Sequence, residues 1–238
     1  NAVEAMLYVA SRFPDVVALY CRSDRENHGT HKPWRPNPNY SILERIESSG
    51  VLSAMLYTED LGGSLPSELL ISKKLVDAGN AMPHLDGFEF MVDSCWNAFI
   101  RSSGPTIAIN APLSIYNSSN HESISSKTDW SENYSEITSF RKLLQELALL
   151  RGEKIGETDL NRSTDTVRII KCIHALRTGR IGAATRILSE VRSIISFGEF
   201  MRWFLIRNGH SGFSRAIRTP IDHETIQGFS EIVPSCLK

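Results

Sequence analysis

The sequence predicts an all-α fold: an antiparallel helical bundle of about eight to ten helices with one long serine-rich connector. Three observations support this prediction. Apolar residues recur at steps of three and four over several stretches. Two Ser-x-x-Glu patterns, beginning at Ser41 and Ser196, match the capping boxes that start helices. Residues 164–205 carry the clearest helical periodicity in the chain, and 238 residues with 41% apolar side chains suffice for one core.

The N-terminal residues 1–104 are expected to supply the first group of helices. Apolar residues at helical spacing predict a helix over residues 3–13, which ends before Pro14 because the residue before a proline avoids the helical conformation. Residues 16–20 fit either a continuation of that helix or a short strand, and the proline-rich residues 22–39 are predicted to form a loop. Further helices are expected at residues 41–50, 64–78 and 85–99.

A connector over residues 105–133 is expected to follow these helices. Residues 106–109 fit a short extended piece, and residues 118–131 are polar and rich in serine. A connector of this length is uncommon inside a compact domain and is usually functional or disordered.

The C-terminal residues 134–238 are predicted to form helical hairpins. Short connections between successive helices imply that neighbours are antiparallel. We therefore expect residues 1–238 to form one helical domain whose core lies in these hairpins. The helices are expected at residues 135–151, 165–178, 181–195, 196–207 and 222–232.

Charge is distributed unevenly along the chain. Residues 1–161 carry 14 Lys+Arg against 21 Asp+Glu, whereas residues 162–218 carry 11 against 3, and ten of those eleven are arginine. Guanidinium groups pair bidentately with phosphate oxygens, so this basic stretch is a candidate surface for nucleic acid or for an acidic partner. The residues predicted to make that contact are Arg168, Lys171, Arg177, Arg180 and Arg186.

Other interpretations of the basic stretch stay open. It also fits an ordinary solvated surface with internal ion pairs, or a surface that holds the acidic N-terminal part of the chain. Stacking on single-stranded nucleic acid is poorly supported, because few aromatic residues alternate with the basic ones.

No motif nominates a catalytic centre, a cofactor or a metal ion. The sequence contains no phosphate-binding loop, no dinucleotide-binding turn and no nucleophile elbow. The four cysteines include no Cys-x-x-Cys pair and are expected to be buried and reduced. Two clusters of potential ligands are better explained without a metal: Cys21, His28 and His31, whose spacing matches no common zinc site, and the polar helix face with His84, Asp86, Glu89 and Asp93.

The chain is expected to be intracellular, without membrane association. Its apolar residues 194–206 are too few for a membrane span, and they include Glu199 and Arg202. The first residues lack the basic and apolar regions of a signal peptide, and we interpret the chain as a domain excised from a longer protein.

The most specific fragment is residues 169–188, IIKCIHALRTGRIGAATRIL. An apolar helix leads into a basic, glycine-containing turn, and Ala183 and Ala184 then allow two helices to approach closely. This fragment resembles the late helices of the telomere repeat-binding factor homology domain, and residues 222–232 resemble that domain's terminal helix. The resemblance covers only the C-terminal part of the chain.

The resemblance implies a non-enzymatic, all-helical domain that dimerises or docks short peptides, with a separate DNA-binding domain elsewhere in the parent protein. The chain is therefore predicted to be a protein-protein interaction or dimerisation domain of a nuclear, telomere- or chromatin-associated DNA-binding protein. Two alternatives remain. One is a nucleic-acid-binding domain that uses the arginine-rich face of residues 162–218, and the other is an enzyme of unrecognised class.

Overall fold

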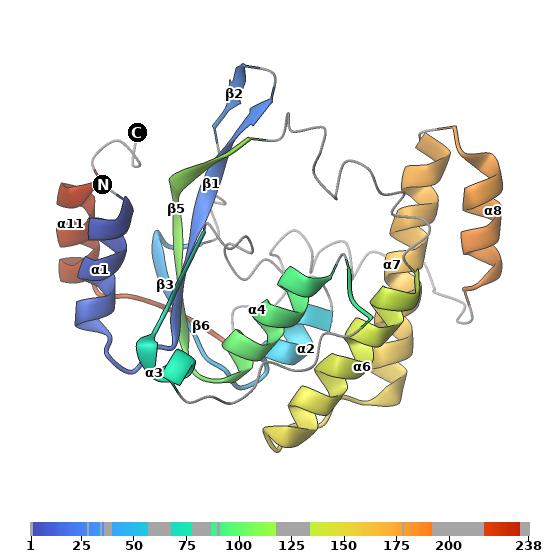
Figure 1. Ribbon diagram of the computed structural model, residues 1–238, viewed down its shortest axis with the longest axis horizontal. Coiled ribbons are helices and arrows are strands. Elements are labelled where there is room, and N and C mark those ends of the chain that lie inside the picture. The colour runs from blue at the N-terminus through green and yellow to red at the C-terminus, as the bar shows by residue number, and fades with distance from the viewer. Residues whose placement is uncertain are drawn as a thin grey trace.

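A six-stranded mixed β-sheet runs through the middle of the computed structural model, with helices on both of its faces (Figure 1). The structure describes residues 2–27, 29–33, 35, 40–56, 68–77, 87–89, 91–117, 134–177, 179–191 and 217–233. The predicted all-α bundle is therefore wrong, and the chain has an α/β fold. The error lies mainly in the N-terminal half, where residues expected in loops and helices form the sheet.

The two long strands at the centre of the sheet are parallel to each other. β1 (Ala18–Asn27) pairs with β5 (Thr106–Asn117), and β3 (Leu43–Ile46) pairs antiparallel with the other side of β5. Beyond β3, the sheet ends at β6 (Arg218–Pro220). The remaining edge of β1 is shared by two short antiparallel strands, β2 (Thr30–Lys32) and β4 (Leu69–Ile71).

The central strand β5 explains why the sheet was not predicted. Side chains alternate along a strand, so Ile107 and Ile109 face one layer of helices while Ala108 faces the other, and all three are buried. A strand buried on both faces is a continuous apolar run, without the alternation that indicates a half-exposed strand. Most of the first half of the expected connector is thus β5, and residues 118–133 lie outside the described part of the chain.

Two further predictions are wrong around the edges of the sheet. Residues 22–27, expected in a loop, continue β1, and residues 30–32 form β2. The helix expected at residues 41–50 is replaced by β3, although the Ser41 amide donates to Glu44 Oε1 at 3.1 Å as in a capping box. Backbone pairing of β3 with strands on both sides outweighs this local helical signal.

Helices α1 (Ala2–Arg12) and α11 (His223–Ile232) cover one face of the sheet side by side (Figure 1). Val9 of α1 and Phe229 of α11 are fully buried in one apolar cluster with Ile109 of β5. Both helices confirm their predictions, because each carries an apolar stripe that faces a single layer.

The opposite face of the sheet is covered by α2 (Val51–Leu56), α4 (Val92–Ser102) and α6 (Tyr134–Leu150) (Figure 1). Cys95 of α4 and Leu144 of α6 are fully buried in the apolar cluster that joins these three helices to the sheet. The structure is therefore layered, with the sheet between two groups of helices.

The helix predictions for this second layer have mixed outcomes. α6 confirms the helix predicted for residues 135–151, and α4 overlaps the one predicted for residues 85–99 but lies further along the chain. Of the helix predicted for residues 64–78, residues 69–71 form β4 and only the short α3 (Lys73–Asp77) is helical among the described residues. Strand pairing of β4 with β1 accounts for that difference.

A helical hairpin, α7 (Glu157–Arg177) followed by α8 (Ile181–Ser189), lies on the far side of α6 from the sheet (Figure 1). The hairpin confirms its prediction, although α7 begins earlier and α8 ends earlier than expected. The helix predicted for residues 196–207 lies outside the described residues.

Candidate functional site

The α7–α8 hairpin is held together by small buried side chains. Cys172 and Ala175 of α7 pack with Ala184 and Ile187 of α8 in an apolar cluster separate from those at the sheet. Gly179 ends α7 with a left-handed backbone angle, φ +74°, which glycine adopts without strain. The hairpin thus carries its own small core and projects from the layered part of the molecule.

Arg168, the first of the predicted binding residues, lies inside the hairpin. Its side chain is 16% exposed, and its Nη1 lies 2.9 Å from Asp165 Oδ1. The same nitrogen donates to the Glu190 carbonyl oxygen at 2.9 Å, just beyond the end of α8. Arg168 therefore forms the kind of internal ion pair that the sequence left open, and it joins the two helices.

The other predicted residues lie near the tip of the hairpin and along α8. Arg177 ends α7, Arg180 precedes α8, and Arg186 lies within α8; all three are exposed. The side chain of Lys171 lies outside the described part of the structure. Of the five predicted residues, three are thus exposed on the hairpin.

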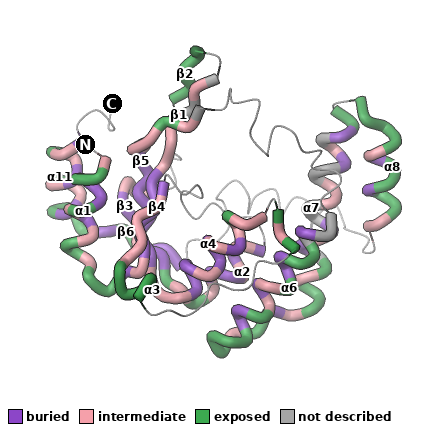
Figure 2. The backbone as a smooth tube through the Cα atoms, viewed as in Figure 1, coloured by how far each residue is buried: buried purple, intermediate pink, exposed green. Residues whose placement is uncertain are grey.

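Three large apolar side chains are exposed on the same hairpin. Leu176, Ile181 and Leu188 are 53%, 70% and 58% exposed. Ile181 and Leu188 lie two helical turns apart on one face of α8, and Figure 2 shows α8 as a mainly exposed helix. Arg186 lies about 140° around α8 from Ile181 and therefore on a different face of the helix. We call the exposed residues at the turn and on the Ile181 face of α8 the hairpin surface, which comprises Leu176, Arg177, Arg180, Ile181 and Leu188.

A second candidate is a groove of about 650 Å³ between α6 and α7. From α6 it is lined by Thr138, Arg141, Lys142 and Gln145, of which Arg141 is buried at 4% exposure. Burial, followed by the neighbouring charge of Arg168, lowers the pKa of Arg141 to about 10. Arg141 and Arg168 therefore bring two positive charges close together at this groove, and the carboxylates of Glu157 and Asp165 line it as well.

A buried polar cluster joins three strands of the sheet. Arg218 Nη1 donates to Glu44 Oε2, which also accepts from Asn110 Nδ2 at 3.1 Å. The Arg218 guanidinium stacks on the Tyr40 ring at 4.0 Å from its centroid. The charges of Arg218 and Glu44 are paired and the cluster lies within the sheet, so we interpret it as structural.

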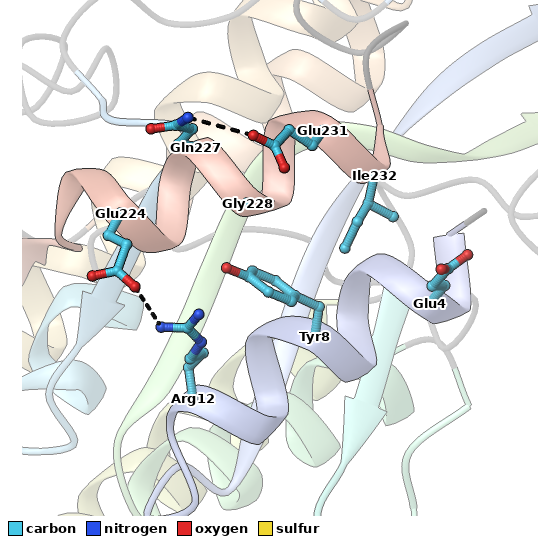
Figure 3. Close-up of a pocket in the computed structure, with 8 residues that line it drawn as sticks. All are labelled: Glu4, Tyr8, Arg12, Glu224, Gln227, Gly228, Glu231 and Ile232. Carbon is cyan, nitrogen blue, oxygen red and sulfur yellow. Dashed lines mark hydrogen bonds and ion pairs between the residues drawn. The ribbon is translucent and has the colours of Figure 1, made fainter.

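A second hollow lies between α1 and α11 (Figure 3). Tyr8 extends from α1 toward Gly228 of α11, and an added Cβ at Gly228 would lie 2.0 Å from the Tyr8 hydroxyl. Arg12 Nη1 lies 3.4 Å from Glu224 Oε1 across the same seam. Close approach and an exposed ion pair make this hollow a packing seam between two helices.

The two clusters of potential metal ligands are only partly described. Cys21 is buried in the sheet, and His31 Nε2 bonds Asp24 Oδ2 at 3.0 Å, whereas His28 lies outside the described residues.

In the second cluster, His84 and Asp86 also lie outside the described residues. The Glu89 amide donates to Glu136 Oε1 at 3.1 Å, and burial raises the pKa of Asp93. Within the described ranges, no group of three or more His, Cys, Asp or Glu side chains could hold a metal ion.

Comparison with known proteins does not place the chain in a family. No family model matches the sequence, and no curated protein is significantly similar to it. Among the helices that the structure describes, none is both long and apolar enough to span a membrane. The function is therefore argued from the geometry of this chain alone.

Proposed function

We propose that this chain is a non-enzymatic protein-interaction domain whose hairpin surface binds an acidic, amphipathic segment of a partner protein. One observation carries the proposal: large exposed apolar side chains stand beside exposed arginines on one projecting hairpin. Ile181 and Leu188 offer apolar area, and the exposed Arg177 and Arg180, at the turn before Ile181, add positive charge near it. A segment with apolar side chains along one face and carboxylates beside them complements both features.

Direct nucleic-acid binding is the second candidate, and the exposed arginines favour it. The apolar residues Ile181 and Leu188 do not, because surfaces that follow a phosphate backbone are built from basic and polar side chains. Arg168 is also committed to Asp165 and Glu190, which removes one of the predicted phosphate contacts. A protein partner therefore fits the hairpin surface better than a duplex does.

The resemblance to the telomere repeat-binding factor homology domain remains a prediction. Residues 169–188, which carry it, lie in a helical hairpin, a motif common to many folds. The all-helical fold that it implied does not hold for this chain. Self-association, a nuclear location and a DNA-binding parent protein are likewise predictions, and the proposal does not depend on them.

The test is a calorimetric titration of the purified chain with a synthetic amphipathic helix bearing leucine on one face and glutamate beside it. We expect micromolar binding that weakens at least about tenfold in the double variant Ile181→Ser, Leu188→Ser, because hot-spot apolar side chains each contribute over 1 kcal/mol. The matched control is Leu150→Ser, which removes a side chain that is 80% exposed at the end of α6. That control should bind the peptide like the unchanged chain.

Parallel titrations with double-stranded and single-stranded DNA and RNA, each at two salt concentrations, separate the candidates. Phosphate binding through several arginines should fall by about tenfold or more between low and physiological salt. Tight nucleic-acid binding that is lost in Arg177→Glu, Arg186→Glu would overturn the proposal. So would a dimer in sedimentation that dissociates in the Ile181→Ser, Leu188→Ser variant, since the occupant would then be a second copy.

A further inference from the structure

A pocket of about 290 Å³ lies at the edge of the sheet where the parallel strands β1 and β5 begin. It is lined by the turn between α1 and β1, the start of α3, the C-terminal end of α4 and the residue that follows α6. Four segments that are far apart in the sequence thus converge on one concave space. Its volume is close to the lower end of the range of small-molecule sites, about 300–1,000 Å³.

The apolar part of the pocket lining is held firmly in place. Val17, Leu75 and Phe99 are partly buried and pack against one buried apolar cluster that β1 and α4 share. The Val17 amide donates to the Pro105 carbonyl oxygen at 2.9 Å, and the Val17 carbonyl oxygen accepts from the Ser72 amide at 2.9 Å. The apolar wall is therefore formed before any ligand binds, as in most small-molecule sites.

Two cationic side chains, Lys74 and Arg151, line the same pocket. Both residues are exposed, and neither forms an ion pair with a carboxylate in the ranges that the structure describes. Arg151 Nη2 donates to Ser103 Oγ at 3.0 Å, which leaves the other N–H groups of the guanidinium available to a ligand. The pocket thus combines an apolar wall with two cations that carboxylates of the chain do not occupy.

Positive charge remains when the neighbouring carboxylates are counted. Asp15 is the only carboxylate of the pocket lining, and it pairs with Arg45 at 2.7 Å, which lies outside the lining. Arg45 also pairs with Glu47 at 2.8 Å. Lys74, Arg151 and Arg45 together therefore face Asp15 and Glu47, three cations against two carboxylates, and one positive charge is left over.

The end of α4 does not cancel this charge. The Phe99 carbonyl oxygen accepts from Ser103 Oγ at 2.7 Å, and the Ile100 carbonyl oxygen accepts from the Ser103 amide at 3.1 Å. Two oxygens that would repel an anion are thus already bonded. Because the same Ser103 hydroxyl accepts from Arg151, Ser103 also acts as a positioning residue for the guanidinium.

We propose that this pocket binds a small organic carboxylate with an apolar body. The carboxylate lies between Lys74 and Arg151, and the apolar body packs against Val17, Leu75 and Phe99. Guanidinium groups match carboxylate oxygens bidentately, and the lysine adds a point charge. One surplus positive charge suits a monocarboxylate better than a phosphate, which carries about −1.5 to −2 at neutral pH.

The test is a two-dimensional NMR titration of the full chain with phenylpropionate, a carboxylate on an apolar body. We expect a dissociation constant on the order of 1 mM or tighter, with amide shifts at Val17 and Ser103. Arg151→Gln should weaken binding about tenfold, as expected for a charge-assisted hydrogen bond. Lys74→Ala should weaken it about threefold to fivefold, as expected for an exposed ion pair. Both side chains are exposed, so neither substitution disturbs the core.

The matched control is Lys73→Ala, which removes the neighbouring lysine of α3. Lys73 lies outside the pocket lining and faces Asp77 at 3.9 Å, so its loss should leave the affinity for phenylpropionate unchanged. Uncharged phenylpropanol should bind at least about tenfold more weakly than phenylpropionate, because it offers no carboxylate to the two cations. Ser103→Ala should weaken phenylpropionate but not phenylpropanol, whereas a collapsed pocket would weaken both.

Three results would overturn the proposal. These are no amide shifts at about 10 mM phenylpropionate, equal affinity for phenylpropanol, or equal loss of affinity in Lys74→Ala and Lys73→Ala. The pocket and the hairpin surface share no residue, so the outcome is independent of the proposed peptide binding.

Discussion

Arg218 Nη1 donates to Glu44 Oε2 at 2.5 Å, a contact that joins β6 to β3 across 174 residues of sequence. The two side chains are 3% and 5% exposed, so the pair lies in the interior. Arg218 ends the basic stretch of residues 162–218, and Glu44 belongs to the acidic N-terminal part. One arginine of the basic stretch therefore holds the acidic part of the chain, as one sequence interpretation allowed.

Replacing one member of this pair should be far more destabilising than replacing both. Arg218→Met leaves the Glu44 carboxylate buried without its cation, and we expect a loss of about 3–5 kcal/mol in the free energy of unfolding. The double variant Glu44→Leu, Arg218→Met should recover most of that loss. Arg218 Nε and Nη2 have no hydrogen-bond partner among the described residues, so the double variant also removes two unsatisfied donors.

Urea denaturation followed by circular dichroism measures both variants. The control is Arg45→Met on β3, the strand that carries Glu44. The Arg45 guanidinium pairs with Asp15 at 2.7 Å near the surface. An exposed pair of that kind should contribute about 1 kcal/mol or less. Equal losses in Arg218→Met and Arg45→Met would contradict the structural role of the buried pair.

We predict that only glycine fits at position 228 of α11, because Tyr8 of α1 lies directly against it. An added Cβ there would lie 2.0 Å from the Tyr8 hydroxyl, so Gly228→Ala must displace the Tyr8 side chain. We expect a loss of about 1–2 kcal/mol, typical of overpacking, even though alanine favours a helix over glycine by about 1 kcal/mol. In a Tyr8→Ala background the same substitution should instead stabilise the chain. Thermal unfolding of the unchanged chain, the two single variants and the double variant tests this prediction. Additive effects of the two substitutions on the free energy of unfolding would contradict the contact between Tyr8 and Gly228.

Helices were predictable from the sequence where an apolar stripe faces one layer. α1, α6 and α11 satisfy that condition, and each was expected close to its observed bounds. The sheet was not predictable in the same way, because residues 106–111 of β5 are buried on both faces and show no alternation, and the sequence indicated only a short extended piece at residues 106–109. The Ser41 amide does donate the hydrogen bond to Glu44 that a capping box predicts, yet residues 43–46 pair with β5 as a strand and form no helix.

The candidate sites show the same limit. The exposed Arg177 and Arg180 follow from composition, but their position at the turn before Ile181 required the hairpin geometry. Asp165, three residues before Arg168, was the sequence signal for an internal ion pair, since residues at that spacing are neighbours on a helix. The groove at Arg141 was missed, because a polar helix face usually indicates solvent.

Asp222 should make stability depend on pH in the acid range. Its carboxylate accepts the Thr225 amide at 2.8 Å and the Thr225 hydroxyl at 2.9 Å, which lowers the Asp222 pKa below its usual 3.8. A lowered folded-state pKa gives stability that is present above the usual pKa and is lost as pH falls through the folded value. Asp222→Asn keeps an acceptor at the helix start but cannot titrate. The difference in free energy of unfolding between the unchanged chain and this variant, measured by urea denaturation, should therefore shrink between pH 5 and pH 2.5. A difference that stays constant over this range would contradict a stabilising role for the ionised Asp222 carboxylate.

Cys21 and Cys95 should resist alkylation in the folded chain. Burial raises the pKa of the Cys21 thiol to about 11 and that of Cys95 to about 12, and the negative charges of Glu68 and Glu136 add to these shifts. Only the thiolate reacts, so at pH 8 less than about 1% of either residue is in the reactive form, and burial also blocks access. Iodoacetamide labelling followed by peptide mass spectrometry should therefore modify both residues slowly in the native state and rapidly in urea. Both thiols lie in the clusters that bind helices to the sheet, so rapid native labelling at pH 8 would mean that these layers open frequently.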